Sequence, residues 1–559
     1  MLIRTHVFLT LLTALVCSSV GATPSVTLVG NPLKPSLLPE QLQTAYKDGA
    51  RTIVIRQGTY LLPHASGPVM TLSGWRNATI SGVGVTLVLT SLAWGDDCFQ
   101  LQKCHAVVLN GMTISQTDVP NYQGRVTSVS RDIKGDVTAI WQCDKGYPDL
   151  AAGTVKFPGA INVVDADTHM LKIGDGDTYN APITKVTAGT WRVDFSNTSE
   201  QIAPGDWLVG RYGSPPIKIH LIGCRDCTVQ NVTLLRNGFA PIREEEGGGN
   251  HYLHCIWKPG PMPAGADTPD VVTNAADGMH MTGAYPGPDI ENCDFRGVFL
   301  DDCIAIHGYF STVKSVTGNT MITTKSAGSN AIPGDCVRIS DENGFFAQAI
   351  VAAARGNADG TTAVILTTDL AIPVGAKFSN PLMDGAGYRI IGCHLGDTRS
   401  RGILAKADNG LIENNVISHC GMSGVSLGPE YYWGEADYVH HVVVRGNLIQ
   451  YNGGATYGGP AIWVHGHGAV GNHDITIVNN RLYSNYQGDI VIEWAKGVAI
   501  SNNLLRATKV WPTSILKKHP IKLDHCSDVT FVGNSLYNSH FWLLPLIEKG
   551  NDVEHLVLR

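Results

Sequence analysis

Short runs in which hydrophobic and polar residues alternate recur along most of the chain, and an asparagine interrupts many of them. Examples are CTVQNVTLL around Asn231, LIENNVI around Asn415 and VVVRGNLI around Asn447. The same pattern also centres on Asn292, Asn480, Asn503 and Asn534. The spacings from Asn415 to Asn534 are 32, 33, 23 and 31 residues. A period of this length indicates stacked units that each bury part of a shared core.

Because the units consist of short strands and tight turns, we predict an all-β chain folded as a right-handed parallel β-helix. Asparagine suits the corner of a coil, since it tolerates left-handed backbone geometry. A β-sandwich is the alternative fold, and it would require hairpin turns of the Asn-Gly type between most of the runs. The sequence does not show that regular alternation of runs and hairpin turns.

The open end of a β-helix exposes unpaired strand edges, and the segment 36–62 is suited to cover one. Pro39 at the expected start of a helix and Gly49 just beyond its end follow the usual asymmetry of helix termini. Leu42 and Ala45 fall on one apolar stripe. We therefore expect an N-terminal helical cap.

Two stretches lack the repeat, and we interpret both as small inserted β-barrels. They share a similar sequence motif, which is PGDWLVGRYG from Pro204 in the first stretch and PGDCVRIS from Pro333 in the second. Insertions into solenoids fall on one face, often the binding face. The predicted organisation is a signal peptide at 1–22, capped β-helix at 23–119, a first barrel at 120–215, β-helix at 216–310, a second barrel at 311–385 and β-helix at 386–559.

The first 22 residues differ in composition from the rest of the chain. Arg4 is their only charged residue, the stretch from Val7 to Val20 is apolar or small, and Val20-Gly21-Ala22 fits a cleavage site. We expect a cleaved signal and a secreted or periplasmic protein. No other segment approaches the roughly 18 uninterrupted apolar residues of a spanning helix, so no membrane span is expected.

Composition narrows the possible partners. Charged residues make up 16% of the chain and the net charge is −7, with no basic run, which argues against nucleic acid. A hydrophobic content of 43% excludes disorder.

Twelve cysteines would remain after cleavage, an even number that permits disulfides. Cys224 and Cys227 lie in an alternating run and are interpreted as core residues, so we predict no metal and no cofactor. An oligomer is compatible with the sequence.

The strongest chemical signal lies between the two predicted barrels. NAADGMHMTG contains Asp277 and His280, and VFLDDCIAIHGYF contains Asp301, Asp302 and His307. Asp277 and Asp301 are 24 residues apart, about one coil, so they can converge on adjacent turns. Neighbouring carboxylates repel, which should raise at least one pKa. A neutral carboxylic acid beside an ionised carboxylate is the pair that glycoside hydrolysis requires. The alternative interpretation is a turn-forming Asp and a solvated corner.

A second group of candidates follows downstream. Its proposed role is substrate binding, with an aromatic platform for a sugar ring and polar groups that fix its orientation. The members are Arg401 and Lys406 in RSRGILAKADNG, Glu430, Trp433 and Glu435 in GPEYYWGEADY, and Trp463 and His465 in AIWVHGHG. Arg401 and Lys406 could equally be surface residues. We assign His280 and His307 to substrate binding as well.

These motifs carry a family resemblance. NAADGMHM followed by LDDCIAIHG resembles the pattern of the polygalacturonase-like right-handed β-helix hydrolases, although the family's Gly-His-Gly is displaced here to Gly466. The chain more closely resembles glycoside hydrolase family 110, bacterial α-1,3-galactosidases with a β-helix and two inserted barrels. RGILAKADNGLIENN and Trp433-Gly434-Glu435 resemble that family's downstream motifs, and the likeness extends from about Leu38 to Asn534.

The resemblance implies a secreted inverting exo-glycosidase that releases terminal α-linked galactose, with Asp277, Asp301 and Asp302 as its catalytic residues. It further implies Asp301 as general acid, with Asp302 and Asp277 acting on the attacking water. A polygalacturonase-like hydrolase of uronic-acid polymers is one alternative. A polysaccharide lyase with Lys406 as base is another, and a non-catalytic glycan-binding β-helix is the third.

Overall fold

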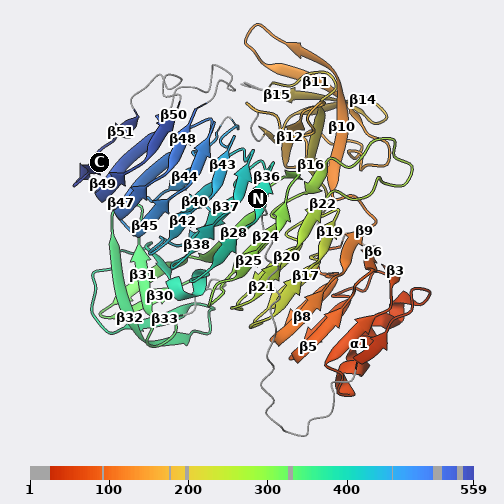
Figure 1. Cartoon of the computed structure of the whole chain (residues 1–559), viewed down its shortest axis with the longest axis horizontal. Helices are drawn as coiled ribbons and strands as arrows, with labels where there is room; N and C mark the ends of the chain where they lie inside the picture. The colour runs from red at the N-terminus through yellow and green to blue at the C-terminus, as the bar shows by residue number, and fades with distance from the viewer. Residues whose placement is uncertain are drawn as a thin grey trace, which may run out of the picture.

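The computed structural model of the chain describes residues 26–90, 93–174, 178–195, 201–213, 215–324, 331–455, 457–507, 519–537 and 546–559. The fold is a right-handed parallel β-helix, as the sequence predicts (Figure 1). Two parallel sheets of 26 and 12 described strands form its walls. The predicted signal peptide lies outside the described residues.

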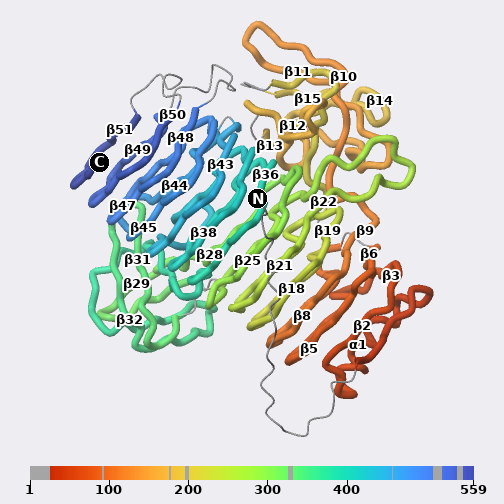
Figure 2. Tube along the Cα trace, in the orientation of Figure 1, coloured from red at the N-terminus to blue at the C-terminus, as the bar shows by residue number. Residues whose placement is uncertain are grey.

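Each coil contributes three short strands, as the coils around the middle of the chain illustrate. One coil contains β24 (Met279–Thr282), β25 (Asp289–Glu291) and β26 (Asp294–Phe295). The next contains β28 (Ile304–Tyr309), β35 (Arg389–Ile391) and β36 (His394–Gly396). Met279 pairs with Ile304, and Ile304 pairs with Ile403 on β37 (Ile403–Ala405). Residues one coil apart therefore stack directly. Figure 2 follows the chain through this stack, with its colours changing steadily from one end to the other.

The asparagines of the repeat occupy two different columns, which corrects the sequence interpretation. Asn231 and Asn292 do adopt left-handed backbone geometry at a corner, with φ of 53° and 52°. From Asn415 onward, however, the left-handed corner is the preceding residue, such as Asn414 or Gly446. The asparagines of this second column are Asn415, Asn447, Asn480, Asn503 and Asn534.

This second column is a ladder of side-chain amides inside the helix. The Nδ2 atom of Asn415 donates to Oδ1 of Asn447 over 3.0 Å, and Nδ2 of Asn447 donates to Oδ1 of Asn480 over 3.0 Å. Each Nδ2 also donates to a backbone carbonyl, as from Asn447 to Ile412 over 3.0 Å. Because buried polar groups must be hydrogen-bonded, the ladder is stable only when it is continuous from coil to coil. Cys393 precedes it, donating its backbone N–H to Oδ1 of Asn415.

The predicted cap is present as α1 (Leu38–Lys47), with Pro39 in its first turn and Gly49 beyond its end. Leu38, Leu42 and Ala45 are its buried residues. The helix lies at the N-terminal end of the stack, next to β1 (Val26–Val29) and β2 (Thr52–Ile55) (Figure 1). It thereby covers the first coil.

The two inserts lie on opposite edges of the stack (Figure 1). The second contains β29 (Ser311–Thr317), β30 (Thr320–Thr323), β31 (Cys336–Ser340), β32 (Phe346–Gly356), β33 (Thr362–Leu366) and β34 (Lys377–Ser379), which form a closed barrel.

The first insert runs from β10 (Asn121–Arg131) to β16 (Trp207–Arg211). Its seven strands pair in the order β13-β12-β16-β10-β11-β15-β14. Among the described residues no ladder joins β13 (Thr178–Tyr179) to β14 (Ile183–Thr187), so this unit is a seven-stranded antiparallel sheet. Trp141 and Trp191 are fully buried in its core.

Cysteines in the described part of the chain are free, and most are buried between the sheets. Cys224 and Cys227 belong to the main hydrophobic core, in agreement with the interpretation from sequence. In the described ranges, no helix has both the length and the apolar character needed to span a bilayer.

Candidate active site

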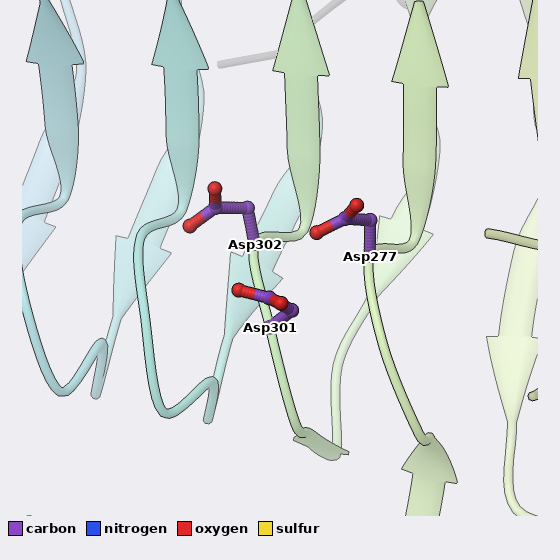
Figure 3. A group of neighbouring side chains, drawn as sticks. All are labelled: Asp277, Asp301 and Asp302. Carbon is purple, nitrogen blue, oxygen red and sulfur yellow. The ribbon is translucent and has the colours of Figure 1, made fainter. Parts of the chain in front are cut away.

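Asp277, Asp301 and Asp302 lie together where the chain enters two adjacent strands, β24 and β28 (Figure 3). Asp277 precedes β24 and the acidic pair precedes β28. The glycine after Asp277 serves close packing between coils rather than a left-handed turn. A Cβ atom on Gly278 would lie 2.5 Å from the carbonyl oxygen of Cys303 in the next coil.

The backbone around the acidic pair is irregular. Asp301 and Asp302 are not part of a strand but of the connection between β27 (Val298–Phe299) and β28. In a regular strand, consecutive side chains point to opposite faces. Here the side chains of Asp301 and Asp302 extend to the same side as that of Asp277, as Figure 3 shows.

The three carboxylates are closer than the expected arrangement of an inverting enzyme. One oxygen of each lies within 4.8 Å of an oxygen of the other two. The mechanism implied by sequence places acid and base about 6.5–9.5 Å apart. Three oxygen ligands at this spacing could also hold a cation. Three guanidinium groups that contact these acids already supply positive charge, which opposes the binding of another cation.

Two of those guanidinium groups hold Asp301. Arg399 Nη2 lies 3.1 Å from Oδ1 of Asp301, and Arg211 Nη2 contacts Oδ2. Burial by itself raises the pKa of Asp301, but the charges of Arg399 and Arg211 outweigh it and lower that pKa well below its usual range. Asp301 is therefore ionised at neutral pH and has no proton to give.

Asp302 has the opposite electrostatic setting. Its side chain is buried, and burial together with the charges of Asp301 and Asp277 raises its pKa to about 7, against the lowering effect of Arg401. The backbone N–H of Arg401 donates to Oδ1 over 2.8 Å, and Nη1 of the same residue donates to Oδ2 over 3.2 Å. The direction of the two pKa shifts favours Asp302 over Asp301 as the group that carries a proton near neutral pH.

His280 and His307 connect Asp277 to the rest of the site. Nδ1 of His280 lies 2.8 Å from Oδ2 of Asp277, and the Nε2 atoms of the two rings are 3.0 Å apart. Burial opposes the charged form of His280, but its hydrogen bond to Asp277 prevails and raises its pKa. Burial lowers the pKa of His307 to about 4. A charged His280 can therefore donate to both Asp277 and the neutral His307, whose Nδ1 donates to the carbonyl of Gly308.

Arg401, Lys406, Glu430 and Glu435 form one ion-pair network beside the acids. Nη2 of Arg401 contacts Oε1 of Glu430, while Nζ of Lys406 lies 2.6 Å from Oε2 of Glu430 and 2.5 Å from Oε2 of Glu435. The Lys406 side chain is fully buried. Burial favours a neutral Glu435, but His307 and Lys406 overcome it and lower its pKa to about 2. All four predicted residues are brought together, and Arg401 links them to Asp302.

The predicted aromatic residues occupy two different settings. Trp433 is at the tip of the turn between Glu430 and Glu435, 65% exposed, and its ring contacts Tyr432 edge-on. Trp463 on β44 (Ile462–Val464) is half-buried and lies against His465, with ring centroids 4.7 Å apart. Burial lowers the pKa of His465 to about 3.

Sequence reasoning missed Arg211 as a residue of the site. It ends β16 at the edge of the first insert, 90 residues before Asp301, so no local spacing connects the two. The available signal was the motif PGDWLVGRYG, in which the arginine directly follows Gly210. Arg399 begins the motif RSRGILAKADNG, from which only Arg401 and Lys406 were assigned to the site.

Comparison with known proteins supports the architecture. The family described as right handed beta helix region matches residues 382–544. A family 28 exopolygalacturonase of Yersinia enterocolitica shares 10% identity at a TM-score of 0.41, covering 96% of this chain and 79% of that one. The A-module of the mannuronan C-5 epimerase AlgE4 of Azotobacter vinelandii shares 9% identity at a TM-score of 0.40, covering 93% of this chain and 94% of that one.

A surface protein and adhesin of Streptococcus pneumoniae, PfbA, is similar to the same degree. It shares 10% identity at a TM-score of 0.40, covering 93% of this chain and 95% of that one. No match was found among curated protein sequences. Similarities this distant carry no information about the activity of this chain.

Proposed function

We propose that this chain is a glycoside hydrolase that releases terminal α-linked galactose from glycans with inversion of configuration. The observation that carries the proposal is the convergence of three carboxylates in which Arg399 and Arg211 contact Asp301 and lower its pKa while burial raises the pKa of Asp302, so that the pKa values of two adjacent acids are split. That split provides a proton donor and a base within one site, the arrangement on which glycosidic bond cleavage depends. The choice of α-linked galactose rests on the sequence resemblance to family 110.

In the proposed mechanism Asp302 protonates the glycosidic oxygen as the bond to the anomeric carbon breaks. Asp277, oriented by His280, accepts a proton from the attacking water, and Asp301 helps to hold that water. The proton on Asp302 passes to the leaving alcohol, and the proton from water passes to Asp277. The proposal of inversion follows the resemblance to family 110, whereas the carboxylates lie closer together than the about 6.5–9.5 Å usual for inverting enzymes, so the anomer of the released sugar is the deciding measurement.

A neutral sugar fits the charges better than a uronic acid. The cations beside the acids already have anionic partners: Arg401 contacts Asp302 and Glu430, and Lys406 contacts Glu430 and Glu435. A carboxylate on the substrate would compete with these glutamates. The same pairing argues against a lyase, since the base of a lyase must reach the substrate and Nζ of Lys406 is buried between two carboxylates.

Crowding around the acids favours attack on a chain end. Arg211 reaches Asp301 from the first insert. On the other side, β41 (Glu435–Ala436) pairs with the end of β28 at the entrance to the second insert. The first insert on one side and the turn that carries β41 on the other therefore border the site, which suits a terminal sugar better than the middle of a polymer. We also propose that the protein is secreted, as its first 22 residues suggest.

The test is incubation with a panel of 4-nitrophenyl α- and β-glycosides and defined galactosides, with NMR of the anomeric proton of freshly released sugar. We expect galactose from α-linked substrates, appearing first as the β-anomer. Galactose that appears first as the α-anomer would refute inversion, and the short spacing of the carboxylates would then indicate a covalent intermediate. Unsaturated products from uronic-acid polymers would favour the lyase. Binding without turnover would favour a glycan-binding protein.

A further inference from the structure

A pocket of about 530 Å³ lies between the first insert and the coils that follow the acids. The insert contributes residues 162–173, and the coils contribute the loops around Cys420, Tyr451 and Tyr486. Its volume falls within the range of about 300–1,000 Å³ that small-molecule sites occupy. None of the site residues predicted from sequence lines it.

The lining combines flat aromatic faces with polar side chains. Tyr451 and Tyr457 come from one connection of the coils and Tyr486 from another, and His419 stacks on Tyr451 with ring centroids 5.1 Å apart. Lys172 and Asp165 line the insert side, 3.8 Å from each other. Apolar C–H faces against aromatic rings, with a few polar groups to fix orientation, are the chemistry by which proteins bind saccharides.

Arg399 joins the pocket to the acids. It lines the pocket, while its Nη2 lies 3.1 Å from Oδ1 of Asp301 and its Nε donates to the carbonyl of Leu300 over 2.6 Å. The side chain of Arg399 would therefore separate a saccharide in the pocket from Asp301. The ion-pair network of Lys406, Glu430 and Glu435 lies instead on the coils that face the second insert.

From this placement we propose that the pocket binds the sugars on the leaving-group side of the scissile bond. The proposal rests on the proposed glycosidase function and extends it, because it assigns a binding site for the part of the glycan that is not galactose. The terminal sugar would occupy the space beside Asp277, Asp302 and the two histidines, and the released chain would remain against the tyrosines.

The test measures binding of neutral disaccharides without a terminal α-galactose, with lactose, N-acetyllactosamine and cellobiose as probes in calorimetric titrations. Tyr457→Ala and Tyr451→Ala remove aromatic faces of the pocket, and Tyr537→Ala on β50 (Ser535–Tyr537) is the control, an exposed tyrosine that does not line it. We expect at least one probe to bind the wild-type protein and each pocket variant to weaken that binding about tenfold or more. The control should bind as the wild type does.

Hydrolysis of 4-nitrophenyl α-galactoside by the same samples separates this proposal from the proposed function. Loss of disaccharide binding in the pocket variants, together with hydrolysis of the galactoside by the wild type, would support the leaving-group site. Equal disaccharide binding in all variants, or no binding of any probe by the wild type, would overturn it. Disaccharide binding without any galactosidase activity would leave a saccharide site in the pocket but overturn its role as a leaving-group site and, separately, the proposed reaction.

Discussion

Asp301 and Asp302 are adjacent in the chain, yet their pKa values shift in opposite directions. Arg399 and Arg211 both contact Asp301, whereas Asp302 is more deeply buried and faces two other carboxylates. The irregular backbone before β28 makes this possible, since it places both side chains close to Asp277 without giving them the same neighbours.

Replacement of Asp302 by asparagine should abolish most turnover of natural galactosides. Loss of a general acid costs about 10²–10⁴-fold in kcat. A substrate with an acidic leaving group, such as 2,4-dinitrophenyl α-galactoside, needs no protonation and should lose far less. The measurement is kcat for both substrates with Asp302→Asn and wild type. An equal loss on the two substrates would contradict the role of Asp302 as acid.

Activity should fall as pH rises through neutrality. Asp302 must be protonated to act, and its pKa of about 7 means that the active fraction decreases above that pH. The dependence of kcat/KM on pH should therefore show an alkaline limb near pH 7, because this ratio reports groups of the free enzyme.

The position of that limb should respond to Asp301. The negative charge of Asp301 raises the pKa of Asp302, so Asp301→Asn should move the limb to lower pH. The residual activity of Asp301→Asn is enough to measure how kcat/KM depends on pH, because the position of the limb does not depend on the absolute rate. A limb that stays in place or moves to higher pH would show that another group controls it.

Trp433→Ala should weaken substrate binding with little effect on kcat. The ring is exposed at the tip of a turn whose ends, Glu430 and Glu435, belong to the ion-pair network, so it can form a platform without supporting the fold. Loss of such an aromatic contact costs about 1–3 kcal/mol. KM for a galactose-terminated trisaccharide is the measurement, with Tyr537→Ala as the control. An unchanged KM would remove Trp433 from the site.

Asn447→Ala should destabilise the β-helix strongly. The change removes hydrogen bonds to Asn415, Asn480 and the carbonyl of Ile412, and it leaves buried groups of both neighbouring coils without partners. Each such group costs about 1–3 kcal/mol, so we expect a loss of at least about 3 kcal/mol in urea unfolding. Asn343→Ala, at an exposed position on the second insert, is the control and should change little. Similar effects of the two substitutions would contradict the ladder.

The candidate acids could be recognised from sequence because a coil has a nearly fixed length. Asp277 and Asp302 are one coil apart, and parallel pairing of Met279 with Ile304 brings them side by side. Lys406 and Glu430 could be proposed for the same reason. Their partnership could not, since the network depends on how the turn carrying Glu435 folds back over β28.

The sequence by itself determined the repeating architecture, the N-terminal cap and the positions of both inserts, because periodicity and helix-end residues are local properties. It also placed the three aspartates in one region. Only the tertiary structure decided which of them carries the proton. The arginines that set their pKa values come from the first insert and from a later coil, 90 and 98 residues away from Asp301 in the chain. Electrostatic interactions act through space, so a pKa depends on neighbours that chain order does not reveal.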